Sequence, residues 1–73
     1  MHDDTKELIG RLFAETTALI EDAHELSVQG QSSKLSVKAA IGAATAMRRM
    51  TEEAGVLAQA VTILARRAQQ KGH

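Results

Sequence analysis

Apolar residues recur at helical spacing over the first third of the chain. A spacing of three or four residues is typical of an amphipathic α-helix. Asp4 and Glu7 precede this pattern with the spacing of a capping box, and Gly30 is suited to end the helix in the left-handed conformation. The pattern predicts a helix over about 5–28. Its apolar members are Leu8, Ile9, Leu12, Phe13, Leu19, Ile20, Ala23 and Leu26.

A longer and more regular stripe occupies the second half of the chain. Its three-four spacing continues for nearly five heptads without a proline. The spacing predicts a helix over about 34–70, after a loop over about 29–33, and either Ser33 or Ser36 is suited to cap its start. The stripe consists of Ser36, Ala40, Ala43, Met47, Met50, Ala54, Leu57, Val61, Leu64 and Ala68.

Two features weaken the prediction of one unbroken second helix. Gly42 and Gly55 each destabilise a helix interior by about 1 kcal/mol relative to alanine. Thr51 is followed by two glutamates, a combination typical of a helix start. A three-helix arrangement with a break near Thr51 therefore stays open.

Two helices joined by a short loop predict an all-α fold, a long antiparallel helical hairpin formed by one domain over 1–73. At 1.5 Å per residue, the helices are expected to be about 36 and 55 Å long. The last three turns of the second helix would then extend past the first helix into water. These turns carry Val61, Ile63, Leu64, Ala65 and Ala68.

The apolar surface of the second helix is also too wide for one neighbour, because alanines flank its main stripe on both sides. One flank carries Val37, Ala44, Ala58 and Ala65, and the other carries Ala39, Ala46 and Ala60. A helix with so wide an apolar face is buried by more than one partner. We therefore expect two hairpins to dimerise into a four-helix bundle. The residues expected at the oligomer interface are Leu12, Leu19, Ala43, Met47, Met50, Ala54, Leu57, Val61, Leu64 and Ala68.

Composition supports self-association and a cytoplasmic protein. A chain of 73 residues rarely folds on one core without a disulfide, a metal or a partner subunit, and this chain has no cysteine. Its acidic N-terminus is unlike a secretory signal, and no apolar run is long enough for a membrane span. Residues up to Ser36 carry a net charge of −4 and the rest +4, which suits pairing of the two halves and sets orientation.

The arrangement of polar residues predicts no enzyme activity. Adjacent carboxylates, such as Glu52 and Glu53, point about 100° apart on a helix and do not converge on a substrate. Glu21 and His24 have the Glu-x-x-His spacing of di-iron bundles, but this pair occurs once and the second helix has no histidine. We therefore expect no catalytic residues, no metal site and no cofactor.

A short segment near the end of the first helix resembles a known phosphorylation motif. His24-Glu25-Leu26 is similar to the phospho-accepting box of sensor histidine kinases, whose dimerisation domains are also helical hairpins. The resemblance covers three residues, and Ser27 follows where that family has an arginine. It implies, as the least favoured of three alternatives, a phosphotransfer or dimerisation module that uses His24.

Two arginine pairs, Arg48-Arg49 and Arg66-Arg67, are the candidate partner-binding residues. The pairs stand 18 residues apart, which is five helical turns, so both emerge on the same side of the second helix. Small antiparallel bundles that bind RNA loops have similar architecture, and a nucleic-acid-binding hairpin is the second alternative. The neutral net charge favours a protein partner, and so does the presence of only one aromatic residue, Phe13, which provides no platform for base stacking. The leading interpretation is a non-enzymatic, homo-oligomeric adaptor or regulatory protein.

Overall fold

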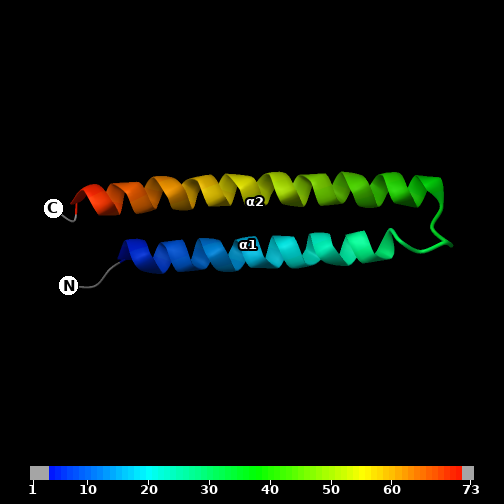
Figure 1. The fold of residues 1–73 in the computed structure, drawn as a ribbon, viewed down its shortest axis with the longest axis horizontal. Coiled ribbons are helices and arrows are strands. Elements are labelled where there is room, and N and C mark those ends of the chain that lie inside the picture. The colour runs from blue at the N-terminus through cyan, green and yellow to red at the C-terminus, as the bar shows by residue number, and fades with distance from the viewer. Residues whose placement is uncertain (1–3, 72–73) are drawn as a thin grey trace.

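The computed structural model describes residues 4–71, which form two antiparallel helices joined by one loop (Figure 1). Helix α1 spans Asp4–Gln29 and helix α2 spans Val37–Lys71. No strand occurs between residues 4 and 71. This arrangement confirms the predicted all-α helical hairpin.

Helix α2 begins three residues later than expected, because Ser36 rather than Ser33 caps it. The backbone N–H of Ala39 donates to Ser36 Oγ at 3.0 Å, and the N–H of Ala40 donates to the Ser36 carbonyl at 2.9 Å. This is the usual hydrogen bonding of a serine N-cap. At the other helix start, Asp4 and Glu7 lie in the first turn of α1, where negative charge complements the helix dipole.

The end of α1 differs from the expected left-handed glycine. No glycine between residues 4 and 71 has a positive φ, and the N–H of Gly30 donates to the carbonyl of Leu26 at 2.9 Å as in a regular helix. The next two N–H groups, of Gln31 and Ser32, donate to carbonyls three residues back, at 3.1 and 3.2 Å. The chain therefore leaves α1 through a tightened last turn, which satisfies the terminal carbonyls without a left-handed residue.

Helix α2 is continuous through Thr51, so the structure excludes the three-helix arrangement. The Thr51 hydroxyl donates to the carbonyl of Arg48 at 3.0 Å, inside the helix rather than at a cap. Neither Gly42 nor Gly55 interrupts the helix. The cost of two glycines is small compared with the packing of a 35-residue helix on its neighbour.

The expected overhang of three turns at the end of α2 is wrong. With 26 and 35 residues, the helices differ by about 13 Å in length. Figure 1 shows α2 extending beyond α1 at both ends, because the loop reaches past the end of α1 before α2 begins. Val61 and Leu64 are consequently half-buried, whereas Ile63, Ala65 and Ala68 are exposed.

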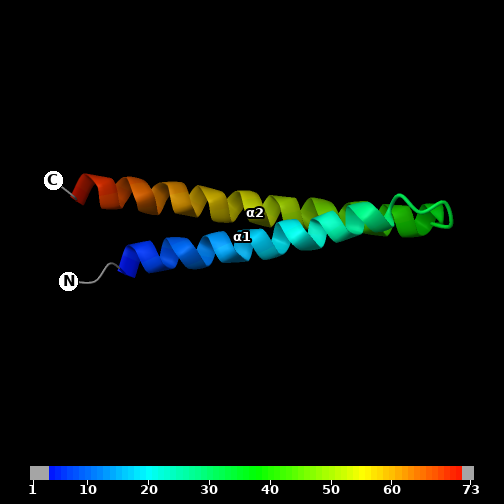
Figure 2. The same ribbon diagram turned by 60° about the horizontal axis from the view of Figure 1, so that its bottom comes forward.

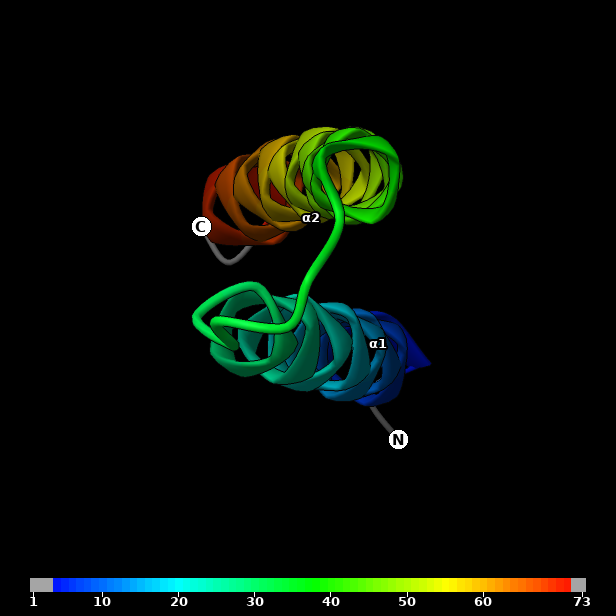
Figure 3. The same ribbon diagram turned by 90° about the vertical axis from the view of Figure 1, so that its right-hand side faces the viewer.

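The two helices pack along one seam and are inclined to each other rather than strictly parallel (Figures 2 and 3). Ala23, which is 7% exposed, is the one fully buried residue among residues 4–70. A small side chain at this position lets the helices approach closely. The half-buried apolar residues of α1 are Ile9, Leu12, Leu19 and Leu26, and those of α2 are Ala43, Ala46, Met47, Met50, Ala54, Leu57, Ala60, Val61 and Leu64.

The hairpin is a single layer of secondary structure. Its Cα atoms extend over 57 × 16 × 11 Å, and their radius of gyration is 16.9 Å. A compact domain of this length would have a radius of gyration of about 11 Å. Globular domains are built from at least two packed layers around a core. The hairpin therefore has the shape of a single layer rather than of a compact domain.

Candidate interaction surfaces

The residues predicted for the oligomer interface line the seam within one hairpin. Nine of the ten are half-buried, and Ala68 is exposed near the end of α2. The half-buried residues among them in α2 follow the predicted three-four spacing. The side of α2 that faces α1 is therefore the predicted one. Their packing against α1 leaves them only partly covered. Their place in an interface between two chains stays a prediction.

The seam has two flanks, which differ in charge. Phe13 and Glu15 are two residues apart and therefore point about 200° apart around α1, one on each flank. Val56 and Ala58 are likewise two residues apart on α2, so they also lie on opposite flanks of the seam. Glu15 and Val56 line one hollow together, which places them on the same flank. Phe13 and Ala58 consequently lie on the opposite flank.

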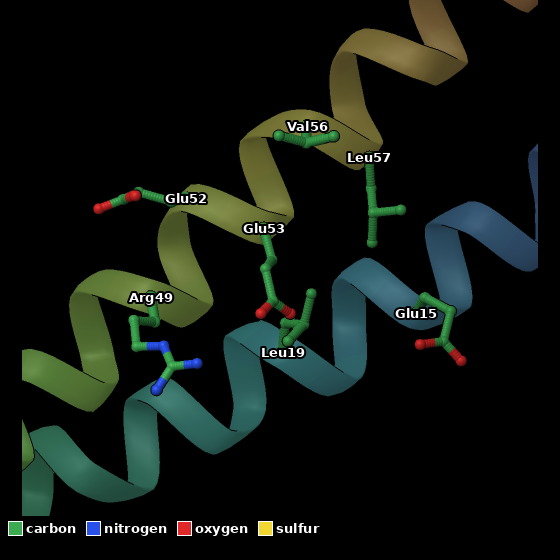
Figure 4. A pocket seen from close by; sticks show the side chains of 7 residues that line it. All are labelled: Glu15, Leu19, Arg49, Glu52, Glu53, Val56 and Leu57. Carbon is green, nitrogen blue, oxygen red and sulfur yellow. The ribbon is translucent and has the colours of Figure 1, made fainter.

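We define the charged flank by Leu8, Glu15 and Asp22 of α1 and by Arg49, Glu53, Val56, Ile63 and Arg67 of α2. Its central feature is an open hollow of about 520 Å³. The hollow is lined by Glu15, Leu19, Arg49, Glu52, Glu53, Val56 and Leu57. Figure 4 shows Leu57 and Glu53 projecting from α2 toward α1, whereas Glu52 points away. Apolar side chains thus lie in the hollow among three carboxylates and one guanidinium.

Charge pairing between the two helices was expected, but between residues 7 and 70 the structure contains no ion pair that joins α1 to α2. The salt bridge in this range joins Arg48 Nε to Glu52 Oε1 at 3.4 Å, one turn apart within α2. Both side chains are largely exposed, so this pair contributes at most about 0.5 kcal/mol. Within residues 7–70, close ion pairs therefore do not join the acidic helix to the basic one.

The four candidate partner-binding arginines, Arg48, Arg49, Arg66 and Arg67, are all exposed. Because α2 is unbroken, the 18-residue spacing of the pairs is kept and corresponds to about 27 Å along the helix. Arg49 and Arg67 lie on the charged flank, and Arg48 and Arg66 lie on the outer side of α2. Carboxylates lie near the pair Arg48 and Arg49. Glu52 forms a salt bridge with Arg48, and Glu53 lines the same hollow as Arg49.

The opposite side of the seam, which we call the uncharged flank, consists of Phe13, Ile20 and Ser27 of α1 and Val37, Ala44, Thr51, Ala58 and Ala65 of α2. A smaller hollow of about 250 Å³ near the loop is lined by both Ser27 and Ala44. Phe13 and Ile20 are 57% and 55% exposed. Members of each helix recur every seven residues, so they form two straight columns beside the seam.

His24 is exposed on α1, and the structure shows no hydrogen bond or ion pair of its side chain among the described residues. A role for His24 in phosphotransfer stays a prediction.

Within residues 4–71 no cluster of three or more histidine, aspartate or glutamate side chains is arranged to hold a metal ion. In the same range neither helix has an apolar stretch long enough to cross a membrane.

Sequence reasoning predicted the α2 half of the uncharged flank, with Val37, Ala44, Ala58 and Ala65, but missed the hollow on the charged flank and the α1 half of the uncharged flank. The signal for the second was present, because Phe13 and Ile20 stand seven residues apart and the alanines of α2 repeat at the same interval. Which columns share a side of the hairpin depends on how the two helices are rotated against each other.

Comparison of the chain with protein-family models, with curated protein sequences and with solved structures finds no match.

Proposed function

We propose that this chain is a non-enzymatic, homo-oligomeric helical adaptor or regulatory protein of the cytoplasm. Two hairpins pair into a four-helix bundle, and the outer surface of the bundle binds another protein. The observation that carries this proposal is the large apolar surface that one hairpin leaves in water. Among residues 4–70, eight large hydrophobic side chains are exposed: Leu8, Phe13, Ile20, Val28, Val37, Ile41, Val56 and Ile63.

The solvent-accessible surface area of the chain shows how much of its surface one hairpin leaves uncovered. The chain exposes 6028 Å², whereas a folded monomer of 7.8 kDa exposes about 4,400 Å². Subtracting the full unfolded-chain area of the five terminal residues, about 800 Å², still leaves an excess of about 800 Å². A protein interface of ordinary size buries about 800 Å² on each partner. An interface of ordinary size with one further copy would therefore reduce the exposed area of each chain to about that of a folded monomer of its mass.

The charged flank supports a protein partner. Its hollow combines the apolar side chains of Leu19, Val56 and Leu57 with charges of both signs. Interfaces that assemble reversibly have this composition, with apolar contacts at the centre and charged groups around them. The two carboxylates near the first arginine pair oppose a phosphate backbone at the same place. This arrangement favours a partner with both apolar and charged side chains.

Sedimentation equilibrium over a range of micromolar concentrations tests the proposal. We expect a dimer or higher oligomer whose melting temperature rises with protein concentration, because unfolding is coupled to dissociation. A well-folded monomer with a concentration-independent melting temperature would refute self-association.

The second candidate function is nucleic-acid binding, which the alignment of four exposed arginines along α2 favours. If these arginines bind phosphates, replacing Arg48 and Arg49 by alanine should lower the slope of log affinity against log salt by about 0.7–0.9 for each phosphate that is no longer neutralised. The melting temperature should change little, because both side chains are exposed. We expect no measurable binding of RNA or DNA at physiological salt. A micromolar, salt-sensitive complex that this double substitution abolishes would favour the second candidate.

A further inference from the structure

We infer that the uncharged flank is the surface through which two copies of this chain associate, with α1 of each copy lying on α2 of the other. The inference rests on the self-association proposed above and adds which face is used and how the copies are oriented. It leaves the charged flank and its hollow on the outside of the dimer, where another protein can reach them.

The distribution of charge distinguishes the two flanks. Over the four turns from Phe13 to Ser27, the α1 column of the uncharged flank has no charged side chain, and the α2 column has none from Val37 to Ala65. An interface on the charged flank would instead enclose Glu15 and Glu53, and neither carboxylate has a salt bridge within residues 7–70. Burying an unpaired carboxylate costs several kcal/mol. Association through the uncharged flank avoids this cost.

The two columns of the uncharged flank complement each other in size. The α1 column has bulky side chains, Phe13 and Ile20, whereas the α2 column has the small residues Ala44, Thr51 and Ala58 at corresponding levels. Ser27 and Ala44 line the same hollow near the loop. Moving seven residues along each antiparallel helix brings Ile20 level with Thr51 and then Phe13 level with Ala58. Large residues facing small ones interdigitate well between packed helices.

A twofold axis parallel to the helices makes use of this complementarity. With this axis, α1 of one copy lies on α2 of the other copy without a shift along the helix axis. Ile20 then faces Thr51 across the interface, and Phe13 faces Ala58. A perpendicular twofold axis would stack α1 on α1, with bulky residues on bulky ones. The helices carry formal net charges of −4 for α1 and +4 for α2. Like-charged helices would therefore also meet in the perpendicular arrangement, which disfavours it.

Matched glutamate substitutions identify the flank. Ile20 and Val56 are both β-branched and similarly exposed in the hairpin, at 55% and 65%, but they lie on opposite flanks. We expect Ile20→Glu to raise the dissociation constant of the dimer roughly 100-fold or more, as for a buried interface anchor. Val56→Glu should change it by less than about threefold. Equal effects, or a larger effect of Val56→Glu, would overturn the inference.

Disulfide trapping identifies the orientation, and it remains informative if a glutamate variant fails to fold. The chain has no cysteine, so every disulfide formed comes from an introduced pair. Ile20→Cys chains are mixed with Thr51→Cys chains and oxidised mildly, and each variant is also oxidised alone. We expect a disulfide-linked dimer in the mixture and not in either variant alone, because Cα atoms more than about 7 Å apart do not form a disulfide.

Two further mixtures separate the alternatives. A link between Phe13→Cys and Ile20→Cys chains would show α1 on α1, and a link between Glu15→Cys and Val56→Cys chains would show an interface on the charged flank. Either result overturns the inference while self-association stands. Sedimentation of the wild-type chain as a folded monomer would refute the proposed oligomer itself, so the two failures are distinguishable.

Discussion

Leu57→Ala tests how the seam stabilises the protein. Leu57 is half-buried between the helices and also lines the hollow of the charged flank. The substitution removes three carbon atoms, which at about 0.8 kcal/mol for each buried group contribute at most about 2.4 kcal/mol. Because the hollow is open, no enclosed cavity forms, and the destabilisation stays at the low end of the usual range for leucine truncation. We expect a decrease of about 2 kcal/mol per chain in the free energy of unfolding.

In the proposed dimer this effect is doubled, because each folded dimer would contain two copies of Leu57. A change of about 4 kcal/mol per dimer shifts the equilibrium between folded dimer and unfolded chains by about a thousandfold. Urea denaturation followed by circular dichroism at several protein concentrations, fitted to this equilibrium, measures the change. A loss of stability without dissociation into smaller species would contradict the coupling of folding and association.

Val56→Ala is the matched control. Val56 is the preceding residue and is 65% exposed, so removing two methyl groups costs about 0.5 kcal/mol. The higher helix propensity of alanine offsets most of this cost. We therefore expect almost no net change in stability. Equal destabilisation by Leu57→Ala and Val56→Ala would mean that the phase assigned to α2 is wrong.

Two further predictions concern the ends of the helices, both measured as changes in the free energy of unfolding. Gly30→Ala should be tolerated and should stabilise the protein by about 0.4–1 kcal/mol, because Gly30 has no positive φ and a Cβ there would lie 3.4 Å from the Leu26 carbonyl oxygen. A loss of stability would show that the glycine is needed. Ser36→Ala should destabilise the protein by about 1 kcal/mol by removing the cap of α2, whereas Ser33→Ala should have little effect. The reverse order would place the cap at Ser33.

The sequence was sufficient to predict those features of the structure that depend on residues close together in the chain. The half-buried stripe from Ala43 to Leu64 depends on spacings within a few residues. The sequence left Ser33 and Ser36 open as the cap of α2, and the structure shows Ser36 in that role. Gly30 was misassigned because a glycine after a helix is compatible with more than one ending. The choice depends on the direction in which the loop leaves. Here the loop continues past the end of α1 before α2 begins (Figure 1).

The sequence by itself determined that the chain forms two amphipathic helices and which residues of each face the other, and it predicts that one hairpin exposes more apolar surface than a stable monomer does. These properties follow from periodicity and from the ratio of surface to volume in a short chain. Only the tertiary structure decided the longitudinal register, which covers Val61 and Leu64. It also decided the rotation of the helices, which brings Glu15 to Val56 and Ser27 to Ala44. Register and rotation depend on side chains distant in sequence fitting together, and periodicity within one helix contains no information about that fit.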